Sequence, residues 1–182
     1  MSIGDVFADG RYKVLHKLGF GGSSTIWLAR DSVSGTLVAL KVLAAFKSTK
    51  PKDEIEELII FRKLDSLIAS THNAARHNIQ MIKDSFMEEG SNGTHVCLVS
   101  ELAGPSVYAM SVFCSEGRME GSKRLRGDLA REVAKQTATV MELMHSAGLI
   151  HGGSLTLFHN SALLKFLALI RSNVVKRPFS GL

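Results

Sequence analysis

A glycine-rich segment near the amino terminus holds the first residues whose types and spacing could do chemistry. Residues 18–26 read Leu-Gly-Phe-Gly-Gly-Ser-Ser-Thr-Ile and lie between two stretches that are typical of β-strands. Glycines at such a position let the backbone fold closely over a phosphate group, whose oxygens accept hydrogen bonds from backbone N–H groups. An ordinary hairpin with glycines has the same pattern, so a phosphate site and a plain turn both stay open.

A lysine lies inside a stretch that is otherwise apolar. Residues 38–42 read Val-Ala-Leu-Lys-Val, which is typical of a β-strand with a single charge at Lys41. Burying an ammonium group is costly unless an anion pairs with it. The pattern therefore indicates either a buried lysine with an anionic partner or an edge-strand lysine that points to solvent.

An acidic helix follows and offers a partner for this lysine. Asp53 and Glu54 belong to its expected first turn, where negative charge suits the positive end of the helix dipole. Glu57 instead adjoins the apolar side of the helix, in the run Glu-Leu-Ile-Ile-Phe. A helical glutamate is usually only solvated, but Glu57 is the acid of this segment that the pattern favours as a partner.

The elements that must position these residues follow from the hydrophobic periodicity. Short β-prone stretches between turn residues predict an antiparallel meander, then a helix and two more strands. The helix has an expected stripe of Ile55, Leu58, Ile59, Arg62 and Leu67. The expected strands cover residues 11–18, 25–30, 36–43, 79–86 and 95–101, the helix covers residues 52–70, and the turns cover residues 19–24, 31–35 and 89–93.

A second helical region follows a mixed connector in residues 103–126. Asp128 is the expected N-cap of a long helix, and Gly148 is a natural stop after it. The side chains expected on its buried face are Leu129, Val133, Thr137, Val140, Met141 and Met144.

The glycine turn, the strand lysine and the helix glutamate occur in the order found in the amino-terminal lobe of protein kinases. Residues 12–151 resemble that family. Within them, residues 19–31, Gly-Phe-Gly-Gly-Ser-Ser-Thr-Ile-Trp-Leu-Ala-Arg-Asp, look most like the SR-protein-kinase branch and its fungal relatives. Residues 95–102, His-Val-Cys-Leu-Val-Ser-Glu-Leu, are similar to the fifth strand and hinge of that branch.

The resemblance implies an α+β, protein-kinase-like fold. An antiparallel-sheet amino-terminal lobe would occupy residues 1–102. The hinge and the first helices of an incomplete helical carboxy-terminal lobe would occupy residues 103–151. Residues 152–182 would be an atypical basic tail.

The same resemblance implies a site for the phosphates of ATP. The glycine-rich segment would cover the phosphates, Lys41 would contact the α- and β-phosphates, and Glu57 would hold Lys41 by an ion pair. The segment comprises Leu18, Gly19, Phe20, Gly21, Gly22, Ser23, Ser24, Thr25 and Ile26.

An adenine site is implied beside it. Ala39, together with Leu18 or Ile26, would sandwich the adenine ring. The carbonyl of Glu101 and the N–H of Ala103 would meet the edge of the ring.

The sequence departs from the family pattern at His151. A working kinase needs a catalytic-loop Asp as base, together with an Asn and a second Asp that bind magnesium. Residues 151–154 read His-Gly-Gly-Ser, the last Asp of the chain is Asp128, and its last carboxylate is Glu142. We therefore expect no catalytic residue, an incomplete magnesium site and no efficient phosphoryl transfer by this chain. Asn160 has the wrong spacing for a transferred metal role.

Three explanations for residues 152–182 stay open. The segment could be an incomplete or misassembled chain end, as from translation across an intron or a shifted frame. It could belong to a truncated pseudokinase, a non-catalytic module that binds nucleotide or protein. Another chain could also supply the missing parts. The leading hypothesis is a truncated serine/threonine protein kinase whose family transfers the γ-phosphate of ATP to an Arg/Ser-rich protein substrate.

Composition excludes several other classes of protein. The chain has 182 residues and 2 Cys, too few cysteines for a disulfide scaffold, so a reducing compartment and a cytoplasmic or nuclear location are expected. It has no secretory signal pattern and no apolar run long enough to cross a bilayer. The formal charge of +5 comes mainly from the tail, because residues 1–151 hold 18 basic and 17 acidic residues. This distribution argues against direct binding of nucleic acid.

Overall fold

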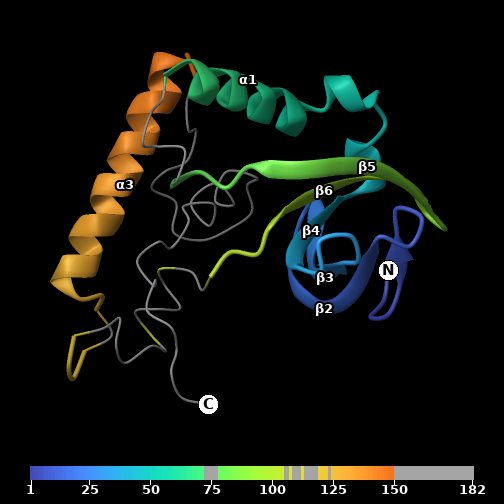
Figure 1. Cartoon of the computed structure of the whole chain (residues 1–182), viewed down its shortest axis with the longest axis horizontal. Helices are drawn as coiled ribbons and strands as arrows, with labels where there is room; N and C mark the ends of the chain where they lie inside the picture. Colours follow the sequence, from blue (N-terminus) through green and yellow to red (C-terminus); the bar gives the residue numbers. More distant parts are fainter. Residues whose placement is uncertain (72–77, 105–106, 108–111, 113–118, 123, 150–182) are drawn as a thin grey trace. The chain divides into compact units, whose positions relative to one another are not determined.

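Within the described part of the chain, six strands form one antiparallel sheet in the computed structural model (Figure 1). Their order in the sheet is β1-β2-β3-β4-β6-β5, and every neighbouring pair is antiparallel. The strands are β1 (Val6–Phe7), β2 (Tyr12–Gly21), β3 (Ser24–Asp31), β4 (Leu37–Leu43), β5 (Ile82–Gly90) and β6 (Gly93–Glu101). The structure describes residues 1–71, 78–104, 107, 112, 119–122 and 124–149. The expected α+β fold with an antiparallel-sheet lobe is confirmed.

Burial alternates along strand β4, because successive side chains of a strand point to opposite faces of the sheet. Val38 and Leu40 are 3% and 0% exposed and lie on one face, which we term the core face. Lys41 and Leu43 lie on the other face, which we term the helix face. The core face carries a buried cluster of Tyr12, Val14, Trp27, Ala29, Val38, Leu40, Cys97 and Val99.

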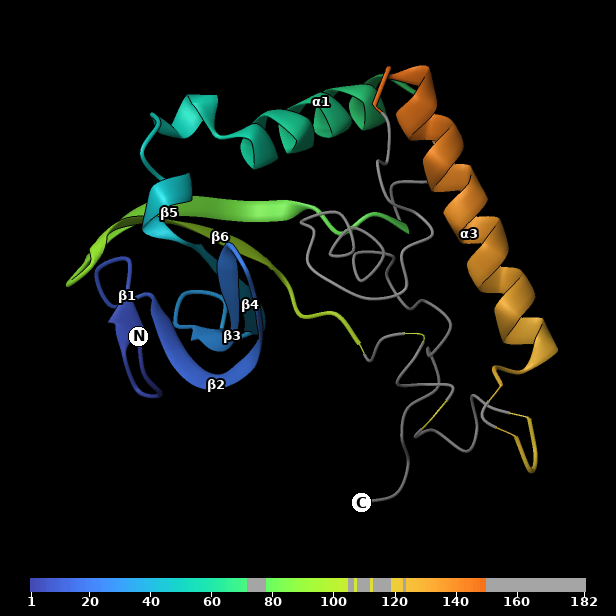
Figure 2. The same cartoon turned by 180° about the vertical axis from the view of Figure 1, so that it is seen from behind.

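Helix α1 (Glu56–Thr71) packs on the helix face of the sheet. A second buried cluster joins the two elements, and Figures 1 and 2 both show α1 running along β5 and β6. The buried side chains of α1 recur every three or four residues, as the helical period requires. Of the expected stripe, Ile59 is 37% exposed and Arg62 is also exposed, so these two assignments were wrong. The cluster comprises Leu43, Ile55, Leu58, Val96 and Leu98, and the further buried residues of α1 are Phe61, Leu64 and Ile68.

Two short 3-10 turns, η1 (Ala45–Lys47) and η2 (Lys52–Glu54), connect β4 to α1. The helix therefore begins at Glu56, later than the expected residue 52. Buried Ser48 lies in this connection and accepts a hydrogen bond from the N–H of Val96, 2.9 Å from its Oγ. Since Val96 belongs to β6, this bond ties the connection to the sheet.

Helix α3 (Gly127–Ser146) ends as the sequence predicts. Gly148 has a φ of 67°, and its N–H and that of Leu149 donate to the carbonyls of His145 and Met144 at 3.0 and 2.9 Å. Glycine adopts this left-handed conformation without strain, so the helix stops there. The expected buried face was partly wrong, because Gln136 and Leu143 are buried together with Val140 and Met144.

The expected N-cap of α3 was also wrong. The N-cap is Arg126, and Asp128 lies in the first turn of the helix. Its carboxylate accepts hydrogen bonds from the guanidinium of Arg126, which lower the pKa of Asp128.

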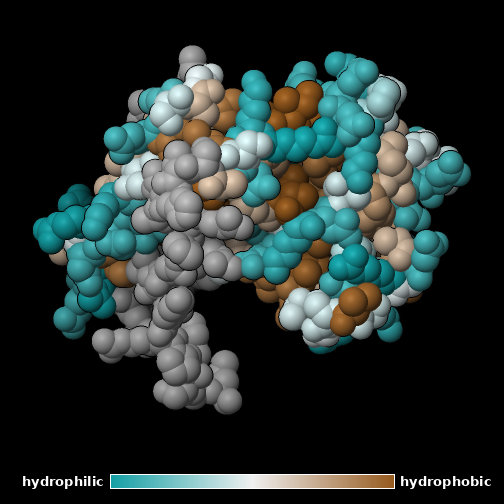
Figure 3. Space-filling view, turned by 45° about the horizontal axis from the view of Figure 1, so that its top comes forward, coloured by the Kyte–Doolittle hydropathy of each residue, from teal (hydrophilic) through white to brown (hydrophobic). Residues whose placement is uncertain are grey.

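The chain divides into two compact units. The first contains residues 1–70 and 81–102, hence the sheet and nearly all of α1. Of the described residues, the second contains 71, 78–80, 103–104, 107, 112, 119–122 and 124–149, hence α3. Within the described residues, no helix is long and apolar enough to span a bilayer. Figure 3 shows hydrophobic side chains interrupting a largely hydrophilic surface in several places.

Candidate functional site

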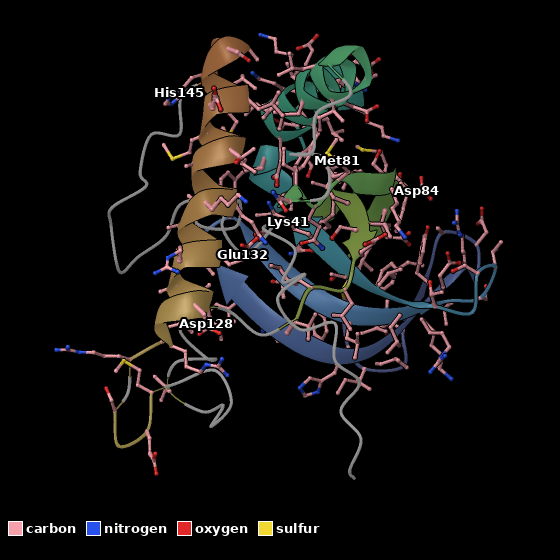
Figure 4. All side chains as sticks on the ribbon, turned by 60° about the vertical axis from the view of Figure 1, so that its left-hand side comes forward. Lys41, Met81, Asp84, Asp128, Glu132 and His145 are labelled. Carbon is pink, nitrogen blue, oxygen red and sulfur yellow. The ribbon has the colours of Figure 1, made fainter. Side chains whose placement is uncertain are left out.

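Lys41 and Glu57 form an ion pair between strand β4 and helix α1. The side chains of Lys41 and Glu57 are 13% and 23% exposed, so the pair is half-buried under the helix. Lys41 reaches the helix because side chains of β4 alternate between the two faces of the sheet and Lys41 is on the helix face. Lys41 is labelled in Figure 4. Of the two readings that the sequence left open, the structure selects the lysine with an anionic partner.

Lys41 belongs to a row of paired residues that crosses four neighbouring strands. Gly19 of β2 pairs with Ile26 of β3, Ile26 pairs with Lys41, and Lys41 pairs with Leu98 of β6. Directly paired residues share a face of a sheet, so the whole row lies on the helix face. A Cβ added to Gly19 would meet no atom within 4 Å, and the backbone beside Ile26 is therefore bare. This arrangement places the ammonium group of Lys41 on the same surface as a backbone position that carries no side chain.

The glycine-rich hairpin is tighter than the sequence indicated. Residues 19–24 were expected to form the turn, but β2 runs to Gly21 and β3 starts at Ser24. Only Gly22 and Ser23 lie between them. The carbonyl of Ser23 accepts a hydrogen bond of 2.9 Å from the N–H of Ala44, which fixes the hairpin tip to the end of β4.

The residues expected around adenine have different surroundings. Ala39 shares the helix face with Ile26, because Ala39 pairs with Leu28, two residues along β3. Leu18 is 46% exposed and lies at a register shift of β2. Glu101 ends β6, and its carboxylate lies 3.0 Å from the ammonium of Lys83. Ala103 is exposed and belongs to the second unit. A role of these residues in adenine binding stays a prediction.

A charged network on the core face was missed at the sequence level. Arg11 donates to both carboxylate oxygens of Asp31, at 3.1 and 3.2 Å, and to Asp84 at 2.9 Å. The hydroxyl of Tyr12 donates to the same oxygen of Asp84, also at 2.9 Å. Since Asp84 lies on β5 and Tyr12 on β2, the network joins strands that do not pair. These residues are far apart in the sequence, so no local sequence pattern predicts their contacts.

The network changes the acidity of its members. The hydrogen bonds from Arg11 lower the pKa of Asp31 to about 2. Burial raises the pKa of Tyr12 above its ordinary value, and its hydrogen bond to Asp84 acts in the same direction. On the same face, burial raises the pKa of Cys97 to about 12, so this thiol stays protonated at neutral pH.

The residues at which the sequence departs from the kinase pattern lie outside the described part of the chain. These are residues 151–154, Asn160 and the remaining basic tail. Among the residues that the structure describes, no group of three or more His, Cys, Asp or Glu side chains is arranged to hold a metal ion.

Comparisons with known proteins find relatives of this chain that are named as protein kinases. The chain is 31% identical over 150 residues to protein kinase dsk1 of Schizosaccharomyces pombe, which covers 82% of this chain and 26% of that protein. It is 30% identical over 149 residues to serine/threonine-protein kinase SKY1 of Saccharomyces cerevisiae, covering 81% of this chain and 19% of SKY1. It is 41% identical over 106 residues to SRSF protein kinase 3 of Homo sapiens, covering 57% of this chain and 18% of that kinase. The chain thus spans at most about a quarter of these relatives. No family model matches it.

Proposed function

This chain is related to serine/threonine protein kinases of the SR-protein-kinase type, and we propose that its first unit binds ATP on the helix face of the sheet. The observation that carries the proposal is the ion pair of Lys41 and Glu57. An ammonium that is half-buried and held by a carboxylate is oriented for a second anion, because it has three donors and uses one of them on Glu57.

The phosphates would lie along the row from Gly19 to Lys41. The bare backbone at Gly19 admits a close approach of phosphate oxygens, and Lys41 neutralises part of their charge. Apolar side chains of Leu18, Ile26 and Ala39 would contact the two faces of the adenine ring. The carbonyl of Glu101 and the N–H of Ala103 would bind its edge.

We also propose a limit on the chemistry of this chain. The reaction of the kinase relatives would be transfer of the γ-phosphate of ATP to a Ser or Thr hydroxyl, and an Arg/Ser-rich protein is the substrate class suggested by the name SRSF protein kinase 3. The sequence has no carboxylate after Glu142, so no residue beyond it can accept the hydroxyl proton as an Asp does. The 182-residue chain by itself would bind the nucleotide without efficient transfer. A cytoplasmic or nuclear location stays a prediction.

Thermal unfolding with added ATP tests the binding site. A ligand at 100 times its dissociation constant stabilises the folded state by about 2.7 kcal/mol, which raises the melting temperature measurably. We expect ATP to raise the melting temperature of the wild-type chain and to have little effect on Lys41→Met. The matched control is Lys47→Met, which removes an exposed lysine of η1 and should respond like wild type. Equal shifts in the wild type and Lys41→Met, or no shift in the wild type, would rule out the assignment.

A kinase assay tests the limit on chemistry. Purified wild-type chain is incubated with ATP, magnesium and an Arg/Ser-rich peptide, and phosphate incorporation is measured. We expect none above the level of Lys41→Met. Incorporation that is lost in Lys41→Met would show that this chain has a complete catalytic apparatus.

A further inference from the structure

Lys17 contacts two aromatic rings of the glycine-rich hairpin. Its ammonium lies 4.9 Å from the ring centroid of Phe20 and 5.6 Å from that of Trp27. Both distances are within the range of cation–π attraction. Phe20 is 81% exposed, whereas Trp27 is 8% exposed and belongs to the core-face cluster. Lys17 therefore links an exposed ring at the hairpin tip to a buried ring of the core.

A β-bulge makes this contact possible. Side chains three positions apart along a regular strand point to opposite faces, so Lys17 and Phe20 would normally be separated by the sheet. The register of β2 shifts between Lys17, which pairs with Trp27, and Gly19, which pairs with Ile26. The extra residue reverses the alternation and brings Phe20 to the face that carries Lys17 and Trp27.

The same shift separates the two sides of the hairpin. Phe20 pairs with Thr25 and lies on the core face, and Gly19 lies on the helix face opposite Ile26. The aromatic ring is therefore held on the side away from the row that contains Lys41. The backbone of Gly19 stays bare on the side where the phosphates would bind.

From this geometry we infer that Lys17 is a positioning residue for ATP binding, because it holds Phe20 and the hairpin tip against Trp27. This inference rests on the proposed function of the helix face. Glycines lose more conformational freedom on ordering than other residues, so a hairpin that contains three of them costs free energy when a ligand fixes it. A contact that orders the tip before ATP arrives lowers this cost and tightens binding.

The test compares Lys17→Met, which keeps the length of the side chain, with Lys17→Arg, which keeps the charge. Cation–π contacts at exposed sites contribute enough to change an equilibrium constant about two- to fivefold. We expect Lys17→Met to weaken ATP binding by about that factor in calorimetry, and Lys17→Arg to restore it. Lys13→Met, which removes an exposed lysine from the same strand, is the matched control and should bind ATP like wild type. Phe20→Leu, which removes the exposed ring, should weaken ATP binding as Lys17→Met does.

Fluorescence tests the contact without any nucleotide. Trp27 is the only tryptophan of the chain, so the emission spectrum reports on this site alone. A charge beside an indole shifts its emission, and the spectrum should therefore change in Lys17→Met and return toward wild type in Lys17→Arg. An unchanged spectrum in Lys17→Met would overturn the contact. A changed spectrum with unchanged ATP affinity would overturn the positioning role. Absence of ATP binding by the wild type would instead overturn the proposed function, and the positioning role with it, even if the spectrum changes.

Discussion

The two faces of the sheet hold their charges in different ways. On the core face, Arg11 donates to Asp31 and Asp84 and lies 4.8 Å from the ring centroid of Tyr12. Asp31 accepts further hydrogen bonds from the N–H of Val33 and the hydroxyl of Ser34, both at 3.0 Å. Every member of this network therefore has several partners within the chain.

On the helix face, Lys41 has a single partner among the described residues, Glu57. A charge network whose members satisfy one another fixes a structure but has little left to offer a ligand. A pair that leaves donors unused is stable enough to persist and can still bind an anion. The difference between the two faces thus separates a structural role from a binding role. Substitutions on each face of the sheet test this difference.

The largest effect on stability is expected from Arg11→Met. This change removes the hydrogen bonds to Asp31 and Asp84 and leaves these two carboxylates on the core face without their cation. Asp31 is 5% exposed and loses its cation, so the midpoint of unfolding in urea should fall more than in any of the other variants. The ATP affinity of the folded protein should stay close to that of wild type. The control is Arg30→Met, an exposed arginine whose hydrogen bond goes to the carbonyl of Gly35. An equal loss of stability in Arg30→Met would mean that the network on the core face stabilises the fold no more than an exposed arginine does.

Acid unfolding should reveal the same network through Asp31. The hydrogen bonds from Arg11 lower the pKa of Asp31 to about 2 in the folded state, below its ordinary value. A carboxyl with a lowered pKa contributes stability above its unfolded pKa and loses that contribution as the pH falls through the folded value. Urea unfolding from about pH 5 to about pH 2 should therefore show a steeper loss of stability in wild type than in Asp31→Asn. Parallel pH curves for the two proteins would contradict the role given to Asp31.

The sequence predicted most of the fold because local patterns determine it. Alternating apolar residues identified β2, β3, β4 and β6, and the glycine after α3 identified the end of that helix. The predicted limits of strands and of buried faces were wrong where contacts between distant segments determine them. The start of β5 was placed at residue 79 instead of Ile82. Ile59 was assigned to the buried face of α1 although it is 37% exposed, and the buried Phe61 was missed.

The candidate site was predicted less completely. Lys41 and Glu57 could be paired from the order of motifs, and the structure brings them together. The contact of Lys17 with Phe20 could not be predicted, because it depends on a β-bulge at Leu18 that reverses the alternation of β2. The strand–strand pairing that creates such a bulge is not encoded in the spacing of any one segment.

A smaller loss of stability is expected from Glu57→Gln on the helix face. The amide keeps the shape of the side chain but removes the charge opposite Lys41. The free energy of unfolding should fall by about 1 kcal/mol or less, as for other partly exposed ion pairs. The free energy of ATP binding should weaken by more than the free energy of unfolding falls, because Lys41 is no longer oriented by a carboxylate. Glu56→Gln, the neighbouring exposed acid of α1, is the control for calorimetry and urea unfolding. The comparison of the two faces would fail if Glu57→Gln lost stability but kept the ATP affinity of wild type.

The smallest effect on stability is expected from Gly19→Ala. This variant should lose ATP affinity while its stability stays close to that of wild type. The new Cβ would meet no atom within 4 Å, and Gly19 has no positive φ, so the folded chain can accept alanine without strain. Stability should change by no more than about 1 kcal/mol and can rise, because alanine restricts the unfolded chain. The new methyl group lies on the helix face beside Ile26, where the phosphates of ATP would approach the backbone. Adding atoms to a close contact costs about 1–3 kcal/mol, so ATP affinity should fall by about fivefold or more. Gly127→Ala at the start of α3, which also has open space around its Cβ, should leave ATP binding unchanged. If Gly19→Ala binds ATP as tightly as wild type, the nucleotide does not approach this strand, and the bare backbone on the helix face has no binding role.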